Sequence, residues 1–203
     1  MTVRQKDAEQ DVLSLDEEKR LLEACTGKRK HLIPLIICLL DTGARRGETL
    51  KLKFSDLDFE NRLITYQALN TKTLKTRQIA MTTRVYNELS KLWEDSSKNE
   101  DELVFKFRDV RSSFENACID AGIPTGRPFG ITPHSLRHSA ATRLINNHLP
   151  IQMVSRILSH ENPQTTYRYL SSTDETLRQA ASIFESIQNP AFNDSQIESD
   201  LIN

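Results

Sequence analysis

Three side chains that could bind an anion share one predicted helix face. His134, Arg137 and His138 stand at i, i+3 and i+4, a spacing that brings side chains together on a helix. Thr132 and Pro133 are typical of an N-cap and a first helical position, so a helix is predicted from there to about residue 146. The N–H donors and positive dipole end of a helix N-terminus favour an anion. A structural ion-pair cluster or a surface stripe would have the same spacing.

A second cationic site follows an apolar run. Residues 31–41 are predicted to form a buried helix that ends at Gly43, and Arg45 and Arg46 come directly after it. A guanidinium is always charged and can bind phosphate oxygens through two parallel hydrogen bonds. Glu48, three residues after Arg45, could hold it in place. The alternative is a pair of solvent-facing arginines with one ion pair.

A histidine and two tyrosines make a third candidate. His160 follows Leu158 and Ser159 at the end of a predicted helix, and Tyr167 and Tyr169 lie in a short helix predicted to open at residues 162–163. A histidine near a tyrosine is common, so this pattern alone assigns no chemistry.

A charged hairpin adds further cations. Residues 62–66 and 78–81 are predicted as two short strands, and Lys72, Lys75 and Arg77 lie in the polar segment between them. The segment is therefore expected to form a basic hairpin tip.

The remaining elements are helices with local start or stop signals. They are predicted after Ser14, which has Glu17 in a capping box, over Glu48–Phe54, after Thr82 or Thr83, over Val110–Ala121, from Pro150 to about Ser159, and over Thr173–Ile187.

These motifs together resemble the catalytic domain of tyrosine recombinases of the phage integrase family. The segment Thr42–Glu48 (TGARRGE) looks like the family's first arginine box, Thr132–His138 (TPHSLRH) is similar to its His-x-x-Arg box, and Leu158–His160 resembles the third box. Tyr169 lies nine residues after His160, where the family usually has its nucleophile. The resemblance covers about residues 13–187 and implies a mainly helical fold with a small antiparallel sheet (α+β).

The resemblance implies a role for each matching residue. Tyr169 would attack a DNA phosphodiester and form a 3′-phosphotyrosine, a covalent intermediate that splits one hard step into two easier ones. Arg45 and Arg137 would clamp the non-bridging oxygens, and Lys72 would protonate the leaving 5′-oxygen. His134 would support proton transfer and bind the phosphate, and His160 would hydrogen-bond the phosphate or Tyr169. Glu48 and His138 would support the site. No metal or cofactor is expected.

Several positions depart from the family pattern or compete with the assigned residue. Tyr167 competes with Tyr169, and Lys75 competes with Lys72. Ser159 replaces the glycine usual before the third-box histidine, which matters if a positive φ is required there. Ala44 replaces the more usual leucine and would leave less packing.

Size and composition fit one globular domain. The chain has 203 residues, 37% of them hydrophobic and 27% charged. Residues 1–12 are expected to be a linker, 13–187 the catalytic domain, and 188–203 an acidic, disordered tail. Relatives of this type also carry an N-terminal helical domain that clamps DNA. Since the chain begins almost at the catalytic domain, weak and salt-sensitive DNA binding is expected.

The net charge of −1 is unevenly distributed. Residues 1–24 carry −3, and residues 94–102 and 185–203 carry −4 each, so the remaining body carries +10. A basic body with acidic ends could bind a polyanion such as double-stranded DNA. Ordinary solvated faces are the alternative.

The cysteines and the apolar runs exclude other classes. Cys25, Cys38 and Cys118 are far apart and form no disulfide or metal pattern. No run is long enough to span a bilayer and the N-terminus has no signal-peptide pattern, so a cytoplasmic location is expected.

The predicted function is therefore a site-specific DNA recombinase or integrase. The alternatives are a non-catalytic DNA-binding relative and a type IB topoisomerase-like relaxing enzyme. The family resemblance implies a tetramer on two DNA sites, with a monomer possible in the absence of DNA. Thr173–Ile187 is the candidate for the helix exchanged between neighbours, and docking of this helix on its own chain is the alternative.

Overall fold

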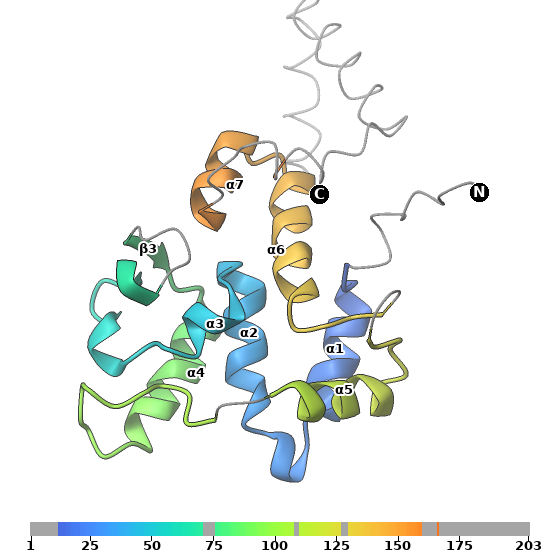
Figure 1. Cartoon of the computed structure of the whole chain (residues 1–203), viewed down its shortest axis with the longest axis horizontal. Helices are drawn as coiled ribbons and strands as arrows, with labels where there is room; N and C mark the ends of the chain where they lie inside the picture. Colours follow the sequence, from blue (N-terminus) through green and yellow to red (C-terminus); the bar gives the residue numbers. More distant parts are fainter. Residues whose placement is uncertain (1–11, 71–75, 108–109, 127–129, 160–165, 167–203) are drawn as a thin grey trace, which may run out of the picture. The chain divides into compact units, whose positions relative to one another are not determined.

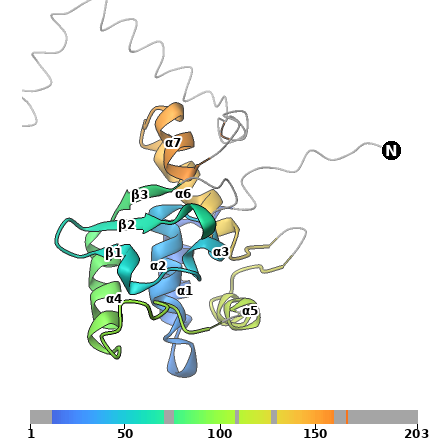
Figure 2. The same ribbon diagram turned by 60° about the vertical axis from the view of Figure 1, so that its left-hand side comes forward.

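Helix α2 (Leu32–Thr42) lies at the centre of the fold, with other helices around it (Figures 1 and 2). The computed structural model describes residues 12–70, 76–107, 110–126, 130–159 and 166. Nine of the eleven residues of α2 are buried, and Pro34 is tolerated because it lies in the first turn. The buried helix predicted at 31–41 is confirmed.

The other elements follow in a mostly helical order. They are α1 (Leu15–Ala24), η2 (Gly27–Arg29), α3 (Arg46–Thr49), η3 (Phe54–Asp56), β1 (Leu57–Asp58), β2 (Leu63–Tyr66), η4 (Ala68–Asn70), β3 (Arg77–Ala80), α4 (Thr83–Glu94), α5 (Arg111–Asp120), α6 (Ser135–Asn146) and α7 (Ile151–Leu158). The expected fold, mainly helical with a small antiparallel sheet, is confirmed.

Local capping signals set several of these helices. The Ser14 hydroxyl accepts a hydrogen bond from the Glu17 N–H, and the Glu17 carboxylate accepts one from the Ser14 N–H, so the predicted capping box is present. Thr82 caps α4 by accepting from the Val85 N–H. The helix predicted over Glu48–Phe54 is wrong in extent, because α3 ends at Thr49 and the chain forms a separate 3₁₀ turn from Phe54.

The sheet has three antiparallel strands in the order β1-β2-β3. Ile64 pairs with Leu57 on one side and with Ile79 on the other. Strand β1 was not predicted, since two residues carry no alternation to detect. Strand β3 begins at Arg77, one residue earlier than expected, and Arg77 lies directly opposite Tyr66.

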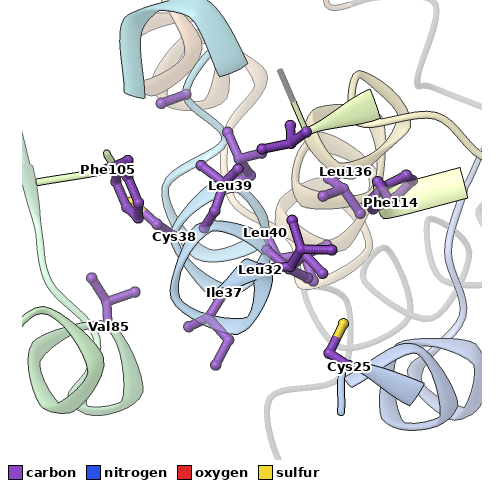
Figure 3. Close-up of a cluster of buried hydrophobic side chains, with 14 of the residues drawn as sticks. Cys25, Leu32, Ile37, Cys38, Leu39, Leu40, Val85, Phe105, Phe114 and Leu136 are labelled. Carbon is purple, nitrogen blue, oxygen red and sulfur yellow. The ribbon is translucent and has the colours of Figure 1, made fainter. Parts of the chain in front are cut away.

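The main core forms where α2 meets its neighbours (Figure 3). Cys38 and Leu39 of α2 lie among side chains that include Val85 from α4, Leu136 from α6 and Phe105 from the segment between α4 and α5. Burial of this apolar surface is the dominant favourable term in folding. All three cysteines are free and buried.

A buried carboxylate ties helices together on another side of α2. Glu18 of α1 accepts from Arg84 of α4 and from Arg143 of α6, both at 2.5 Å. Arg84 also donates from Nε to Asp41 of α2 at 2.7 Å. We call these four residues the Glu18 cluster. It has two cations and two anions, so it is neutral.

Candidate active site

The turn after α2 positions the first arginine box. Gly43 has a φ of +61° and its N–H donates to the Leu39 carbonyl, which ends the helix. A Cβ on Gly43 would lie 2.5 Å from Cδ2 of Leu158, so this close approach also requires glycine. The Thr42 hydroxyl donates to the Cys38 carbonyl and accepts from the Ala44 N–H. These hydrogen bonds fix the backbone of the turn, and so they fix the position from which Arg45 extends.

Arg45 is held between α3 and the end of α7. Its Nη1 donates to Oε1 of Glu48 at 2.8 Å, and its Nη2 lies 3.4 Å from the Ser159 carbonyl oxygen. A quarter of the Arg45 side chain stays exposed, whereas 3% of the Glu48 side chain does. Arg46 is exposed. The predicted pairing of Arg45 with Glu48 is confirmed.

Glu48 has a second cationic partner that was not predicted. Nη2 of Arg77 donates to Oε2 of Glu48 at 2.6 Å. Burial alone would raise the pKa of the Glu48 carboxyl, but hydrogen bonds from Arg77 and Arg45 outweigh it and lower that pKa below its ordinary value. Glu48 is therefore a carboxylate at neutral pH. We call Arg45, Glu48 and Arg77 the Glu48 cluster.

Arg77 could have been found from strand alternation. The sequence places Arg77, Ile79 and Met81 on the same face of a strand, and the apolar members mark that face as the inner one. The prediction that Arg77 lies in the hairpin tip, which followed from the run of basic residues that ends there, is wrong because β3 begins at Arg77.

Arg137 joins the three boxes at one point. Its guanidinium is buried and donates from Nη1 to the Gly43 carbonyl at 2.7 Å and from Nη2 to the Leu158 carbonyl at 2.5 Å. Gly43 lies in the first box, Arg137 in the second and Leu158 in the third. These segments are 94 and 21 residues from Arg137 in the chain, so the fold brings together what the sequence separates.

The two histidines of the second box lie beside Arg137. The rings of His134 and His138 are 4.7 Å apart and nearly perpendicular. The predicted helix start was wrong, because α6 begins at Ser135 with His134 in the N-cap position. Thr132 instead lies in the preceding turn, where its carbonyl accepts from the Ser135 N–H. His134 retains helical φ and ψ angles, so the predicted i, i+3, i+4 face is preserved.

Ser159 ends α7 in the left-handed conformation, with a φ of +51° and a ψ of +52°. The glycine that the family usually has here would adopt this conformation without strain, whereas a residue with a Cβ pays about 1–2 kcal/mol. The sequence indicates that serine in place of glycine matters if φ is positive here. Because φ is positive at Ser159, the replacement does matter.

The described residues can bind an anion but give no sign of a metal site. Arg45, Arg77 and Arg137 carry three positive charges against the single carboxylate of Glu48, a net charge of +2. Among the described residues, no group of three or more His, Cys, Asp or Glu side chains could hold a metal ion. Nor is any helix in this part of the chain long and apolar enough to cross a membrane.

Some predicted site residues lie outside the described residues. They are Lys72, Lys75, His160, Tyr167 and Tyr169, together with the predicted short helix from residue 162, the helix Thr173–Ile187 and both terminal segments. Their assignments remain predictions.

The fold is that of a tyrosine recombinase catalytic domain. The crystal structure of XerA recombinase superposes with a TM-score of 0.70 at 26% identity, over 91% of this chain and 65% of that one. The catalytic domain of bacteriophage HP1 integrase gives a TM-score of 0.65 at 28% identity, over 88% of this chain and 97% of that domain. A Tn1549 transposon integrase in complex with transposon right end DNA, at 21% identity and a TM-score of 0.73, shares the fold.

The chain belongs to the phage integrase family, whose model matches residues 11–176. The tyrosine recombinase XerA of Thermococcus kodakarensis is 30% identical over 178 residues, which is 83% of this chain and 60% of that relative. The integrase of Haemophilus phage HP1 is 30% identical over 175 residues, 85% of this chain and 46% of that protein. The chain thus spans about three fifths or less of these relatives. Neither alternative function is favoured by them.

Proposed function

We propose that this chain carries the catalytic centre of a site-specific DNA recombinase that cleaves and rejoins strands through a 3′-phosphotyrosine. The observation that supports this most is the position of Arg137, whose guanidinium contacts the ends of α2 and α7 and so unites the three boxes. Arg45 reaches the same end of α7 through the Ser159 carbonyl. Two guanidinium groups at one point suit a phosphate with two non-bridging oxygens.

The proposed chemistry conserves the energy of the broken bond. Tyr169 gives its hydroxyl proton to His134, and its oxygen attacks the scissile phosphorus. The bond to the 5′-oxygen breaks, and a proton from Lys72 goes to that oxygen. Arg45 and Arg137 stabilise the charge that grows on the phosphate in the transition state. His134 and His160 bind the phosphate or assist proton transfer, with Glu48 and His138 as supporting groups. Rejoining reverses these steps, so no nucleotide cofactor is consumed.

Double-stranded DNA is the proposed substrate, and a tetramer on two DNA sites is the proposed assembly. The DNA complexes of the Tn1549 integrase and of the XerH recombinase with difH substrate support the first proposal. Light scattering of the protein with and without a two-site DNA would test the second, with four protomers expected on the DNA.

A suicide substrate tests the reaction and the nucleophile together. Nicked DNA with the end sequence of the element that encodes the protein is mixed with wild type, Tyr169→Phe or Tyr167→Phe, and the products are separated on a denaturing gel. A covalent band is expected with wild type and Tyr167→Phe and not with Tyr169→Phe. A band that disappears only in Tyr167→Phe would move the nucleophile there. DNA binding without any covalent band would overturn the catalytic proposal.

A further inference from the structure

Arg77 is a buried cation that the proposed chemistry does not use. Only 9% of its side chain is exposed, although it follows the basic segment of the hairpin. Because Arg77 lies directly opposite Tyr66 in an antiparallel pair, both side chains are on the same face of the sheet, and Tyr66 is buried. The guanidinium carbon of Arg77 lies 4.6 Å from the centre of the Tyr66 ring. Strand register therefore turns Arg77 inward, away from solvent.

Glu48 links Arg77 to Arg45, the arginine of the first box. Each arginine takes one oxygen of the same carboxylate, with Arg77 at 2.6 Å and Arg45 at 2.8 Å. A carboxylate held on both oxygens cannot rotate, so the Nη1 of Arg45 has a fixed acceptor. The other donor group of Arg45 is then directed to the end of α7, at the Ser159 carbonyl.

The hydrogen bonding of Arg77 does not favour a purely stabilising role. Within the structure, its Nε and Nη1 are buried and have no hydrogen-bond acceptor. An unsatisfied buried donor costs about 1–3 kcal/mol, which the face of the Tyr66 ring offsets only in part. A residue kept at such a cost is better explained by what it does for its partner.

We propose that Arg77 is a positioning residue that holds Glu48, and through it Arg45, in the geometry needed to clamp the scissile phosphate. Arg77 also begins β3, five residues after Lys72 in the sequence, so the same contact anchors the strand that follows the proposed general acid. This inference rests on the proposed recombinase function, but it assigns Arg77 no contact with DNA.

A double-mutant cycle tests this coupling. Arg77→Gln, Glu48→Gln and the double variant are compared with wild type in the rate of covalent adduct formation at saturating nicked DNA. In metal sites, loss of a residue that orients a ligand typically lowers activity or metal affinity by about 10–100-fold. By analogy, we expect Arg77→Gln to lower the rate of adduct formation by a similar factor. Because both residues act on Arg45 as one unit, the double variant should lose little more than Glu48→Gln alone.

A second measurement separates positioning from DNA contact. Affinity for the nicked DNA and its dependence on salt should change less than about 3-fold in Arg77→Gln, since no phosphate contact is lost. The matched control is Arg84→Gln, which removes one of the two arginines of the Glu18 cluster and should leave the adduct rate unchanged. If Arg77→Gln does not fold, Arg77→Lys, which keeps the charge but not the fork, takes its place in the cycle.

The outcomes are distinct. Losses that simply add in the double variant, or a parallel fall in affinity and salt dependence, would overturn the positioning role. If wild type forms no adduct, the proposed function fails instead. The same variants are then compared in the shift of the thermal midpoint that inorganic phosphate causes. We expect the losses of this shift to be non-additive in the double variant, and additive losses would overturn the proposal.

Discussion

Two buried glutamates in this domain each bind two arginines, yet the two clusters differ in charge balance. Glu18 binds Arg84 and Arg143, and Asp41 supplies a second carboxylate. Glu48 binds Arg45 and Arg77, and no further carboxylate is paired with either arginine among the described residues. The first cluster is neutral and the second carries +1, to which Arg137 adds another charge nearby.

This difference separates a structural role from a functional one. The Glu18 cluster satisfies its own charges and ties α1, α2, α4 and α6 together. Under the proposed function, the net positive charge of the Glu48 cluster would stabilise a bound phosphate more than it stabilises the free protein. A buried ion pair is weak evidence for stability by itself, so the charge balance is the more informative feature.

The largest expected contrast is between Arg137→Gln and Arg143→Gln, two substitutions on the same helix. Arg137→Gln should reduce adduct formation by about 100–1000-fold, because one transition-state donor is lost. Arg143→Gln should leave that rate unchanged and lower the free energy of unfolding by about 1.5 kcal/mol. Adduct rates and urea unfolding curves measure the two effects. Equal losses of activity, measured where both variants are folded, would contradict the division of roles.

Inorganic phosphate should stabilise the site and not the Glu18 cluster. At about ten times its dissociation constant, a ligand that binds only the folded state adds about 1.4 kcal/mol. We therefore expect phosphate to raise the thermal midpoint of wild type and of Arg84→Gln, at constant ionic strength. The shift should be much smaller in Arg45→Gln. A shift of the same size in all three proteins would show that phosphate acts elsewhere or through general salt effects.

Acid pH should remove the contribution of the ionised Glu48 carboxylate to the free energy of unfolding. The pKa of Glu48 is lower in the folded protein than its ordinary value of 4.5, so its ionisation stabilises the fold above that pH. This contribution is lost as pH falls below 4.5 and through the folded-state pKa. The difference in unfolding free energy between wild type and Glu48→Gln should therefore shrink on acidification. A difference that stays constant from neutral pH to about pH 3 would contradict the lowered pKa.

The smallest expected effect concerns the turn that Arg45 and Arg137 share. Ser159→Gly removes the strain of a positive φ but adds freedom to the unfolded chain, which leaves a gain of about 0.5 kcal/mol. Thermal unfolding measures it, and Ser155→Gly in the same helix is the control, with a loss expected. Destabilisation by Ser159→Gly would mean that the serine side chain makes a compensating contact.

Features set by neighbouring residues could be predicted from the sequence. The capping box of Ser14 and Glu17, the glycine end of α2 and the pair of Arg45 with Glu48 all depend on residues within four positions of one another. The start of α6 was misplaced by a local ambiguity, since Thr132 and Ser135 can both begin a helix.

Contacts between distant segments could not be predicted in this way. The inward direction of Arg77 depends on the register of β2 and β3, because a slip of one residue would turn it outward. The carbonyl partners of Arg137 depend on how α2, α6 and α7 pack. The family motifs named Arg137 correctly, but only the fold gives the acceptors that hold it.

The carbonyls that hold Arg137 belong to helix ends and not to long loops. Gly43 caps α2, and Leu158 is the last residue of α7. The exposed residues 97–99, between α4 and α5, could therefore be changed without moving this guanidinium. For protein engineering, this means that exposed turns can be altered while the packing of helix ends keeps Arg137 in place.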